Sequence, residues 1–263
     1  MTTVAILGLG EAGRLYARGL LHAGADVRGY DPNHVLGDPD VRQLDDLAGA
    51  LAGADVVVSL VGGVAAASVA REALALAPSS AVYADFNTAA PELKQEVAAL
   101  AAGRGIAMAD VAVLAPVLRA AHRTPLLASG QGAALLAGLL APFGVPVTVI
   151  DGAAGQAARL RLLRSVFMKG LAALVIEADT AAHAAGSGPW LREQMAAEFG
   201  PDGQALIERL IAGTHQHAIR REQEVRDALG ALEATGTPAD MTRATLAWFE
   251  RIAAERIAAE REE

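Results

Sequence analysis

The chain has 263 residues, enough for two average domains, and its 53% hydrophobic and 20% charged residues exclude an intrinsically disordered protein. The absence of cysteine excludes a disulfide scaffold, a zinc–thiolate site and a cysteine nucleophile. The net charge of −8 argues against a nucleic-acid-binding protein, which normally presents a basic face.

Seven short runs of aliphatic and small residues predict buried strands, at Thr3–Leu7, Asp26–Tyr30, Asp55–Leu60, Ala81–Ala84, Ile106–Val111, Leu126–Ser129 and Val147–Ile150. Between them, helices are predicted at Glu11–Ala23, Ala65–Ala77, Pro91–Ala102 and Gly132–Ala141. Strands that alternate with helices are typical of βαβ units. This half of the chain therefore predicts an α/β fold, a Rossmann-type doubly wound and mainly parallel sheet with helices on both faces.

The strand pattern then ends. A long helix is predicted at Gln156–Ala184, two more begin near Pro189 and Gly203, and a last one opens with Thr237 as its N-cap. The sequence thus predicts a dinucleotide-binding domain at residues 1–151 and an all-α substrate and dimerisation domain at residues 152–263.

A membrane-spanning helix is not expected. The run from Thr124 to Ile150 carries no charge, but Pro125, Pro142 and Pro146 interrupt it. The first residues also lack the basic segment of a signal peptide. A soluble cytoplasmic protein is therefore the expectation.

A glycine-rich motif follows the first predicted strand directly. Gly8-Leu9-Gly10-Glu11-Ala12-Gly13 has the spacing G-x-G-x-x-G and opens the first predicted helix. The first glycine permits a tight turn, the second lets backbone N–H groups approach a pyrophosphate, and the third lets helix and strand pack closely. The positive end of the helix adds to this site. We therefore predict a dinucleotide-binding site at residues 8–13.

Asp31 ends the second predicted strand, where an acidic side chain can accept hydrogen bonds from both ribose hydroxyls of an adenosine. The same charge would repel a 2′-phosphate. Asp31 therefore favours NAD over NADP as the cofactor, with NADP still possible. The alternative is a structural role, in which Asp31 forms the turn before Pro32 and Asn33.

These and several downstream residues resemble the β-hydroxyacid dehydrogenase and 6-phosphogluconate dehydrogenase superfamily. Asn87-Thr88-Ala89-Ala90-Pro91 resembles its loop beside the nicotinamide, and Asp110-Val111-Ala112-Val113 resembles the start of its D-x-P-V-S-G-G substrate loop. Met168-Lys169-Gly170 is similar to an uncharacterised phosphogluconate-dehydrogenase-like branch. The resemblance implies cofactor contacts by Val61, Asn87 and Thr88, and substrate contacts by Ala115, Pro116 and Ser165.

The chain departs from the family pattern in its substrate half. Glu177-Ala178 matches the family's Glu-Ala pair, and counting back from it places Arg161 at the catalytic lysine and Ser165 at the substrate-binding asparagine. Leu114-Ala115-Pro116 replaces the Ser-Gly-Gly of the substrate loop. The resemblance is therefore stronger for the cofactor than for the substrate.

Three polar residues share one face of the long predicted helix. Arg161, Ser165 and Lys169 are four residues apart, so each is rotated by only about 40° from the last. We interpret this stripe as the lining of a substrate cleft, with Lys169 as the catalytic proton donor and Arg161 as a clamp for a carboxylate or phosphate. The alternative is a solvated or ion-paired face in which Lys169 reaches the surface. Glu177 is expected to be the structural partner of a basic group.

The favoured function is an NAD(P)-dependent dehydrogenase or reductase, which transfers a hydride between a nicotinamide cofactor and a small, anionic hydroxy or oxo acid. The alternatives are an imine reductase-type enzyme, or a dinucleotide-binding protein without catalytic activity. No metal is expected, because His215 and His217 are spaced for different faces of a helix. Apolar residues on several faces of the long helix predict a homodimer through the C-terminal helices.

Overall fold

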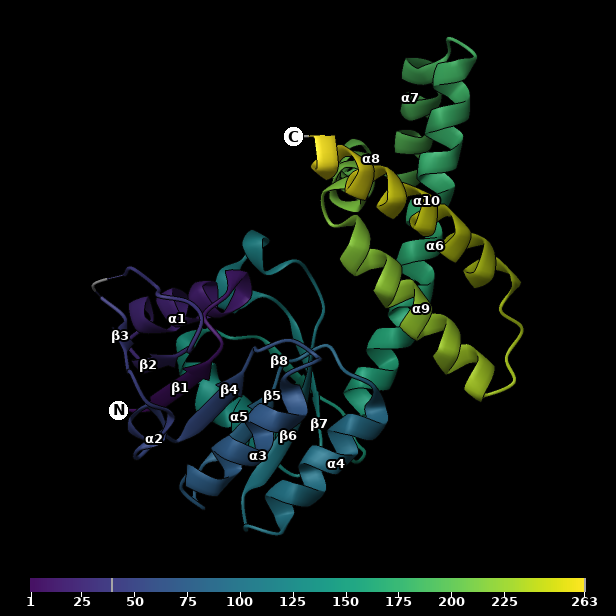
Figure 1. Ribbon diagram of the computed structural model, residues 1–263. Coiled ribbons are helices and arrows are strands. Elements are labelled where there is room, and N and C mark those ends of the chain that lie inside the picture. The colour runs from purple at the N-terminus through teal and green to yellow at the C-terminus, as the bar shows by residue number, and fades with distance from the viewer. Residues whose placement is uncertain (39, 263) are drawn as a thin grey trace. The chain divides into compact units, whose positions relative to one another are not determined.

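The computed structural model describes residues 1–38 and 40–262 (Figure 1). Its strands are β1 (Thr3–Leu7), β2 (Asp26–Tyr30), β3 (Arg42–Gln43), β4 (Val56–Ser59), β5 (Val82–Asp85), β6 (Ala107–Val113), β7 (Leu126–Ser129) and β8 (Val147–Val149). They form one eight-stranded sheet in the order β3-β2-β1-β4-β5-β6-β7-β8. Every neighbouring pair is parallel except β6 and β7. The predicted doubly wound, mainly parallel sheet is confirmed.

The chain divides into two compact units, Met1–Arg161 and Leu162–Glu263. They part inside the long helix α6 (Gln156–Ala184), whereas the predicted domain boundary lies before this helix. Residue 263, the last of the predicted second domain, lies outside the described residues. Within the described part of the chain, no helix is both long enough and apolar enough to cross a bilayer.

The first unit covers both faces of its sheet with helices. These are α1 (Glu11–His22), α2 (Leu47–Leu51), α3 (Ala66–Leu76), α4 (Pro91–Ala102) and α5 (Ala133–Leu140). On one face, Tyr16 and Leu20 of α1 and Leu136 of α5 pack against the strands. On the other, Leu74 of α3 and Val97 of α4 do so. A strand such as β4 is buried on both faces, which explains its continuous apolar run.

One short strand and one short α-helix of the first unit, β3 and α2, were not predicted. Both are too short to produce a recognisable hydrophobic period. The turn before α2 did carry a signal, because the side chain of Asp46 accepts a hydrogen bond of 2.7 Å from the amide of Gly49 and caps the helix.

The second unit consists of helices in the described residues. After α6 come α7 (Gly188–Phe199), α8 (Gly203–Gln216), α9 (Ala218–Ala234) and α10 (Asp240–Glu262). Ala172 and Val175 of α6 pack with Leu210 of α8, Val225 of α9 and Phe249 of α10 to form the core.

Two predictions for the second unit were wrong. The stretch that begins at Gly203 is two helices, since the chain turns at His217 between α8 and α9. The last helix begins at Asp240, so Thr237 is not its N-cap; its hydroxyl lies 2.9 Å from that of Thr235 in the preceding turn.

Candidate functional site

The three glycines of the motif have different surroundings. Gly8 has φ +92°, and a Cβ on it would lie 2.5 Å from the carbonyl oxygen of Leu60. A Cβ on Gly13 would lie 1.9 Å from the carbonyl oxygen of Gly8. A Cβ on Gly10, which precedes α1, would meet no described atom within 4 Å. Gly8 and Gly13 are thus required by the protein's own packing, whereas the space beside Gly10 fits a ligand held by the N-terminus of α1.

The side chain of Asp31 connects the glycine loop, residues 8–13, to the turn after β2 by hydrogen bonds. Its Oδ2 accepts hydrogen bonds from the amide of Leu9 at 2.8 Å and from the ring of His34 at 3.2 Å. Its Oδ1 accepts from the amides of Asn33 at 2.8 Å and His34 at 3.1 Å. Burial raises the pKa of Asp31, but these hydrogen bonds and the nearby imidazole outweigh burial and hold the pKa below its usual value. Asp31 therefore does have a structural role: it fixes the turn that contains Pro32 and Asn33 and anchors the glycine loop.

The loops after β4 and β5 meet the glycine loop at the same edge of the sheet. The amide of Val61 would lie 3.0 Å from a Cβ on Gly8. The amide of Gly62 donates a 2.8 Å hydrogen bond to the side-chain oxygen of Asn87. A Cβ on Gly63 would lie 2.4 Å from the carbonyl oxygen of Thr88. The structure thus brings together residues 8–13, Asp31, Val61, Asn87 and Thr88, as expected of one cofactor site.

This edge is where a Rossmann sheet binds its ligand. The strand order β3-β2-β1-β4-β5-β6 reverses direction between β1 and β4, and dinucleotides bind in the crevice at that switch point. Gly8 follows β1 and Val61 follows β4, so both residues lie beside this switch point.

The predicted substrate residues Ala115 and Pro116 lie in the connection between β6 and β7. Ala115 is half-buried and Pro116 is exposed. The connection packs against α1, where both nitrogens of the half-buried His122 ring are enclosed. Ala121 beside it has φ +47°, a strained conformation for a residue with a side chain.

On α6, the side chain of Lys169 is largely buried. Its Nζ lies 2.7 Å from Oε2 of Glu224 on α9, and both side chains are 15% exposed. Ser165 is buried and Arg161 is half-buried. The stripe is therefore partly enclosed and ion-paired, and Glu224, which the sequence reasoning missed, is the partner of its lysine.

The expectation for Glu177 was wrong. Its carboxylate accepts a hydrogen bond from the indole of Trp248 on α10, and within the described residues no ion pair with a basic group is found. Arg192 and Asp179 form a bidentate ion pair in the helical unit, with contacts of 2.5 and 2.8 Å. Arg192 holds the pKa of Asp179 below its usual value.

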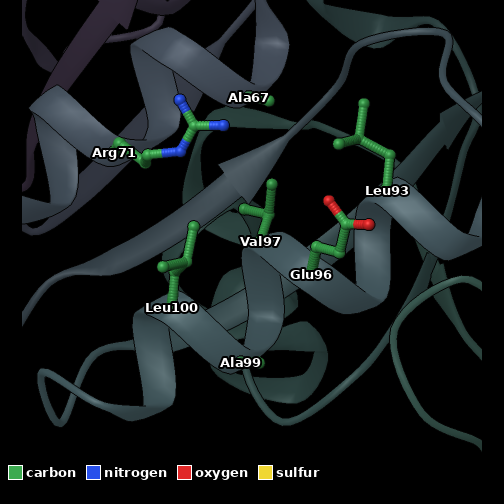
Figure 2. A pocket seen from close by; sticks show the side chains of 7 residues that line it. All are labelled: Ala67, Arg71, Leu93, Glu96, Val97, Ala99 and Leu100. Atoms are coloured by element: carbon green, nitrogen blue, oxygen red, sulfur yellow. The ribbon is translucent and has the colours of Figure 1, made fainter.

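A separate hollow of about 460 Å³ is lined by residues of α3 and α4 (Figure 2). It is lined by Ala67 and Arg71 of α3 and by Leu93, Glu96, Val97, Ala99 and Leu100 of α4. None of the predicted cofactor or substrate residues lines it. We assign the site to the strand ends instead, because the glycine loop lies there.

Comparison with known proteins identifies the family of the first unit. Residues 3–152 match the model of the NAD binding domain of 6-phosphogluconate dehydrogenase. The chain belongs to this family. Residues 182–252 of this family member also match DUF1932, a domain of unknown function. The resemblance proposed from the sequence is confirmed, and residues 3–152 are an NAD-binding domain of the 6-phosphogluconate dehydrogenase type.

Three further proteins are similar to this family member. A conserved hypothetical protein from Sinorhizobium meliloti is 34% identical, with 98% of this chain and 89% of that chain covered and a TM-score of 0.74. An uncharacterised 28.5 kDa protein from Methanothermus fervidus is 28% identical, and the match covers 65% of each chain, slightly less than two thirds. The 3-hydroxyisobutyrate dehydrogenase of Mycobacterium tuberculosis, solved with L-serine, is 23% identical with a TM-score of 0.78, covering 97% and 95% of the two chains. This last likeness shows the fold.

Proposed function

We propose that the protein is an NAD(P)-dependent oxidoreductase that transfers a hydride between a nicotinamide cofactor and a small, anionic hydroxy or oxo acid. The observation that supports this proposal is the glycine loop, residues 8–13, at the switch point between β1 and β4. There Gly10 leaves room for a ligand while Gly8 and Gly13 are fixed by packing. When bound, the cofactor supplies the hydride.

The chain's own residues would bind and orient the two reactants. Residues 8–13 would hold the pyrophosphate through backbone N–H groups and the positive end of α1. Asp31 favours NAD by its charge near the adenosine ribose. Asn87 has its side-chain oxygen occupied by Gly62, so it would support the nicotinamide loop more than bind the ring through that atom.

Lys169 is the proposed proton donor to a substrate oxygen or nitrogen. Its Nζ lies 2.7 Å from Oε2 of Glu224, which holds the amino group in one position for proton transfer. Arg161 is proposed as the clamp for the anionic group, since a guanidinium offers a fork of donors and does not titrate in proteins. Ser165 lies between them on α6 and is proposed to contact the substrate.

Binding and turnover test the proposal separately. Purified protein is titrated with NADH and NADPH by calorimetry, and we expect saturable binding of at least one. It is then assayed against panels of hydroxy acids, keto acids, aldehydes and cyclic imines. No binding of either cofactor would refute the proposal, whereas binding without turnover on any panel would favour a dinucleotide-binding protein without catalytic activity.

An imine reductase-type activity is the second candidate. It is favoured by Arg161 at the position of the family's catalytic lysine and by the altered Leu114-Ala115-Pro116 segment. A substrate without a carboxylate or phosphate would need no anion clamp. Reduction of neutral cyclic imines, together with inactivity toward keto acids, would decide for this candidate.

We also propose a cytoplasmic homodimer. On α6, Leu163, Phe167 and Leu174 are 51%, 66% and 62% exposed and share one side of the helix. Large apolar side chains gathered on one helix face are typical of an interface. A second copy of the chain, related by twofold symmetry, is the proposed partner.

A further inference from the structure

A row of buried polar side chains crosses the sheet near its ligand-binding edge. Ser59, Asp85, Asp110 and Ser129 are register partners on the neighbouring strands β4, β5, β6 and β7. Each is at most 1% exposed. Register partners project from the same face of a sheet, here the face that α3 and α4 cover. Two carboxylates therefore lie next to each other in the core.

Lys94 on α4 supplies a positive charge between these carboxylates. It is 1% exposed, and its Nζ lies 2.8 Å from the carbonyl oxygen of Asp85 and 3.1 Å from Oδ1 of the same residue. It also lies 3.6 Å from Oδ1 of Asp110. Oδ2 of Asp85 and Oδ1 of Asp110 accept no hydrogen bond within the described residues. The two acids thus depend on Lys94 for their charge balance.

Asp85, at one end of this group of charged residues, contacts the proposed nicotinamide loop. Oδ1 of Asp85 accepts hydrogen bonds from the backbone and side-chain nitrogens of Asn87, at 2.9 and 2.7 Å. The same side-chain nitrogen donates to the hydroxyl of Ser59 at 2.9 Å. The side-chain oxygen of Asn87 in turn holds the amide of Gly62. Asp85 therefore fixes the loops that follow β4 and β5.

Asp110, at the other end of the group, contacts the start of α6. Oδ2 of Asp110 accepts hydrogen bonds from the amides of Gly155 at 2.9 Å and Ala158 at 3.0 Å. The hydroxyl of Ser129 accepts one from the amide of Ala157 at 3.0 Å. A carboxylate at a helix N-terminus is stabilised by the unpaired amides and by the helix dipole. Asp110 thus caps the helix that carries Arg161 and Lys169.

We propose that Lys94 is a positioning residue for the hydride-transfer site. Through Asp85 and Asp110 it holds the nicotinamide loop and the first turn of α6 in one arrangement, so that a cofactor bound at the loop stabilises the start of the substrate helix. A buried ion group of this kind adds little net stability compared with apolar side chains, whereas it can specify geometry. The proposal rests on the proposed function, because it requires a cofactor at the loop.

The test is amide hydrogen exchange with and without NADH, or NADPH if that binds more tightly. At a cofactor concentration of 100 Kd, a segment whose opening abolishes binding is protected by about 100-fold. We expect exchange at residues 155–158 of the wild type to slow by about tenfold or more. In the double variant K94M/D110N the protection should fall below about twofold, although the cofactor still binds.

This double variant removes the contacts of Lys94 with Asp85 and Asp110. The amide oxygen introduced at position 110 can still accept from Gly155 and Ala158, and Asp85 can still accept from both nitrogens of Asn87. The matched control is Val97→Ala, which opens a cavity on the same buried side of α4 without altering a charge. It should keep the protection, which separates positioning from a general loss of stability.

Two results would overturn the inference. One is a wild-type protein that binds the cofactor without protecting residues 155–158, and the other is equal protection in K94M/D110N. Both leave cofactor binding intact, so the proposed function survives them. A wild-type protein that binds neither cofactor would instead refute the proposed function and, with it, this inference.

Discussion

The backbone amide of Leu9 donates a 2.8 Å hydrogen bond to the carboxylate of Asp31, so the side chain expected to select the cofactor also fixes the glycine loop. The two roles can be separated by substitution. Asp31→Asn keeps an acceptor for Leu9 and removes the charge, while Asp31→Ala removes both.

The first prediction concerns cofactor choice. We expect the wild type to bind NADH more tightly than NADPH, because Asp31 would repel a 2′-phosphate. Asp31→Asn should narrow this preference by about tenfold, which corresponds to about 1.4 kcal/mol. Asp31→Ala should also weaken the binding of both cofactors, because the loop loses its anchor. Calorimetric titration measures both ratios, and equal affinities in the wild type would contradict the assignment.

The second prediction concerns pH. The pKa of Asp31 is lowered in the folded protein, so its ionised form contributes stability above the unfolded pKa of about 3.9. That contribution is lost as the pH falls through the lower folded value. The difference in unfolding free energy between wild type and Asp31→Asn should therefore be constant from pH 7 to pH 5 and shrink below about pH 4. Urea titrations measure it, and a difference that grows in acid would contradict the prediction.

The third prediction separates two glycines of one motif. Gly13→Ala should destabilise the protein by about 3 kcal/mol or more, because its Cβ would overlap the carbonyl oxygen of Gly8. Gly10→Ala should leave the unfolding free energy almost unchanged and weaken cofactor binding by at least about tenfold, because its methyl group would occupy the ligand side of the loop. Thermal unfolding and cofactor titration of the two variants are compared. Normal cofactor affinity in Gly10→Ala would place the pyrophosphate elsewhere.

Local sequence patterns were sufficient for much of the fold. The bounds of β1, α4 and α6 are those predicted, because a glycine or proline marks an end of each: Gly8 follows β1, Pro91 opens α4 and Gly155 precedes α6. The break between α8 and α9 was missed because a single residue, His217, separates them, and no proline or glycine marks it.

The candidate cofactor loop was visible in the sequence, whereas two charged partners, Lys94 and Glu224, were not. Residues 8–13 are contiguous and follow a strand, so their chemistry is visible in the sequence. Lys94 left only a weak signal, a charge on the buried stripe of α4 that also contains Pro91, Val97 and Ala101. Its carboxylate partners come from the register of β5 and β6, which no local pattern encodes. Glu224 was missed because its helix had not been recognised as separate.

The fourth prediction concerns the ion pair of Lys169 and Glu224. With a substrate from the panels, Lys169→Met should reduce turnover by about 100-fold or more and leave cofactor affinity unchanged. Glu224→Gln should reduce turnover by about tenfold, because the ammonium loses the partner that holds it. Arg161→Lys should mainly raise KM, since it keeps the charge and loses the fork.

The ion pair also provides its own control. In the background of Lys169→Met, Glu224→Gln should have no further effect on turnover, because its contribution acts through the lysine. Steady-state kinetics of the two single variants and the double variant measure this coupling. Independent losses that multiply in the double variant would show that Glu224 acts on another group, and unchanged turnover in Lys169→Met would remove the lysine from the proton-transfer step.

The last prediction concerns the exposed side of α6. Phe167 is 66% exposed and lies on the same side of the helix as the exposed Leu163 and Leu174. Together these three side chains form an apolar strip. Phe167→Glu should convert a dimer into a monomer, because association would bury a carboxylate without a partner. Ala212→Glu, on an exposed position of α8, is the matched control and should remain dimeric. Light scattering at micromolar concentration measures both. A wild-type protein with the mass of a monomer would refute the dimer, and a dimeric Phe167→Glu would move the interface away from this strip.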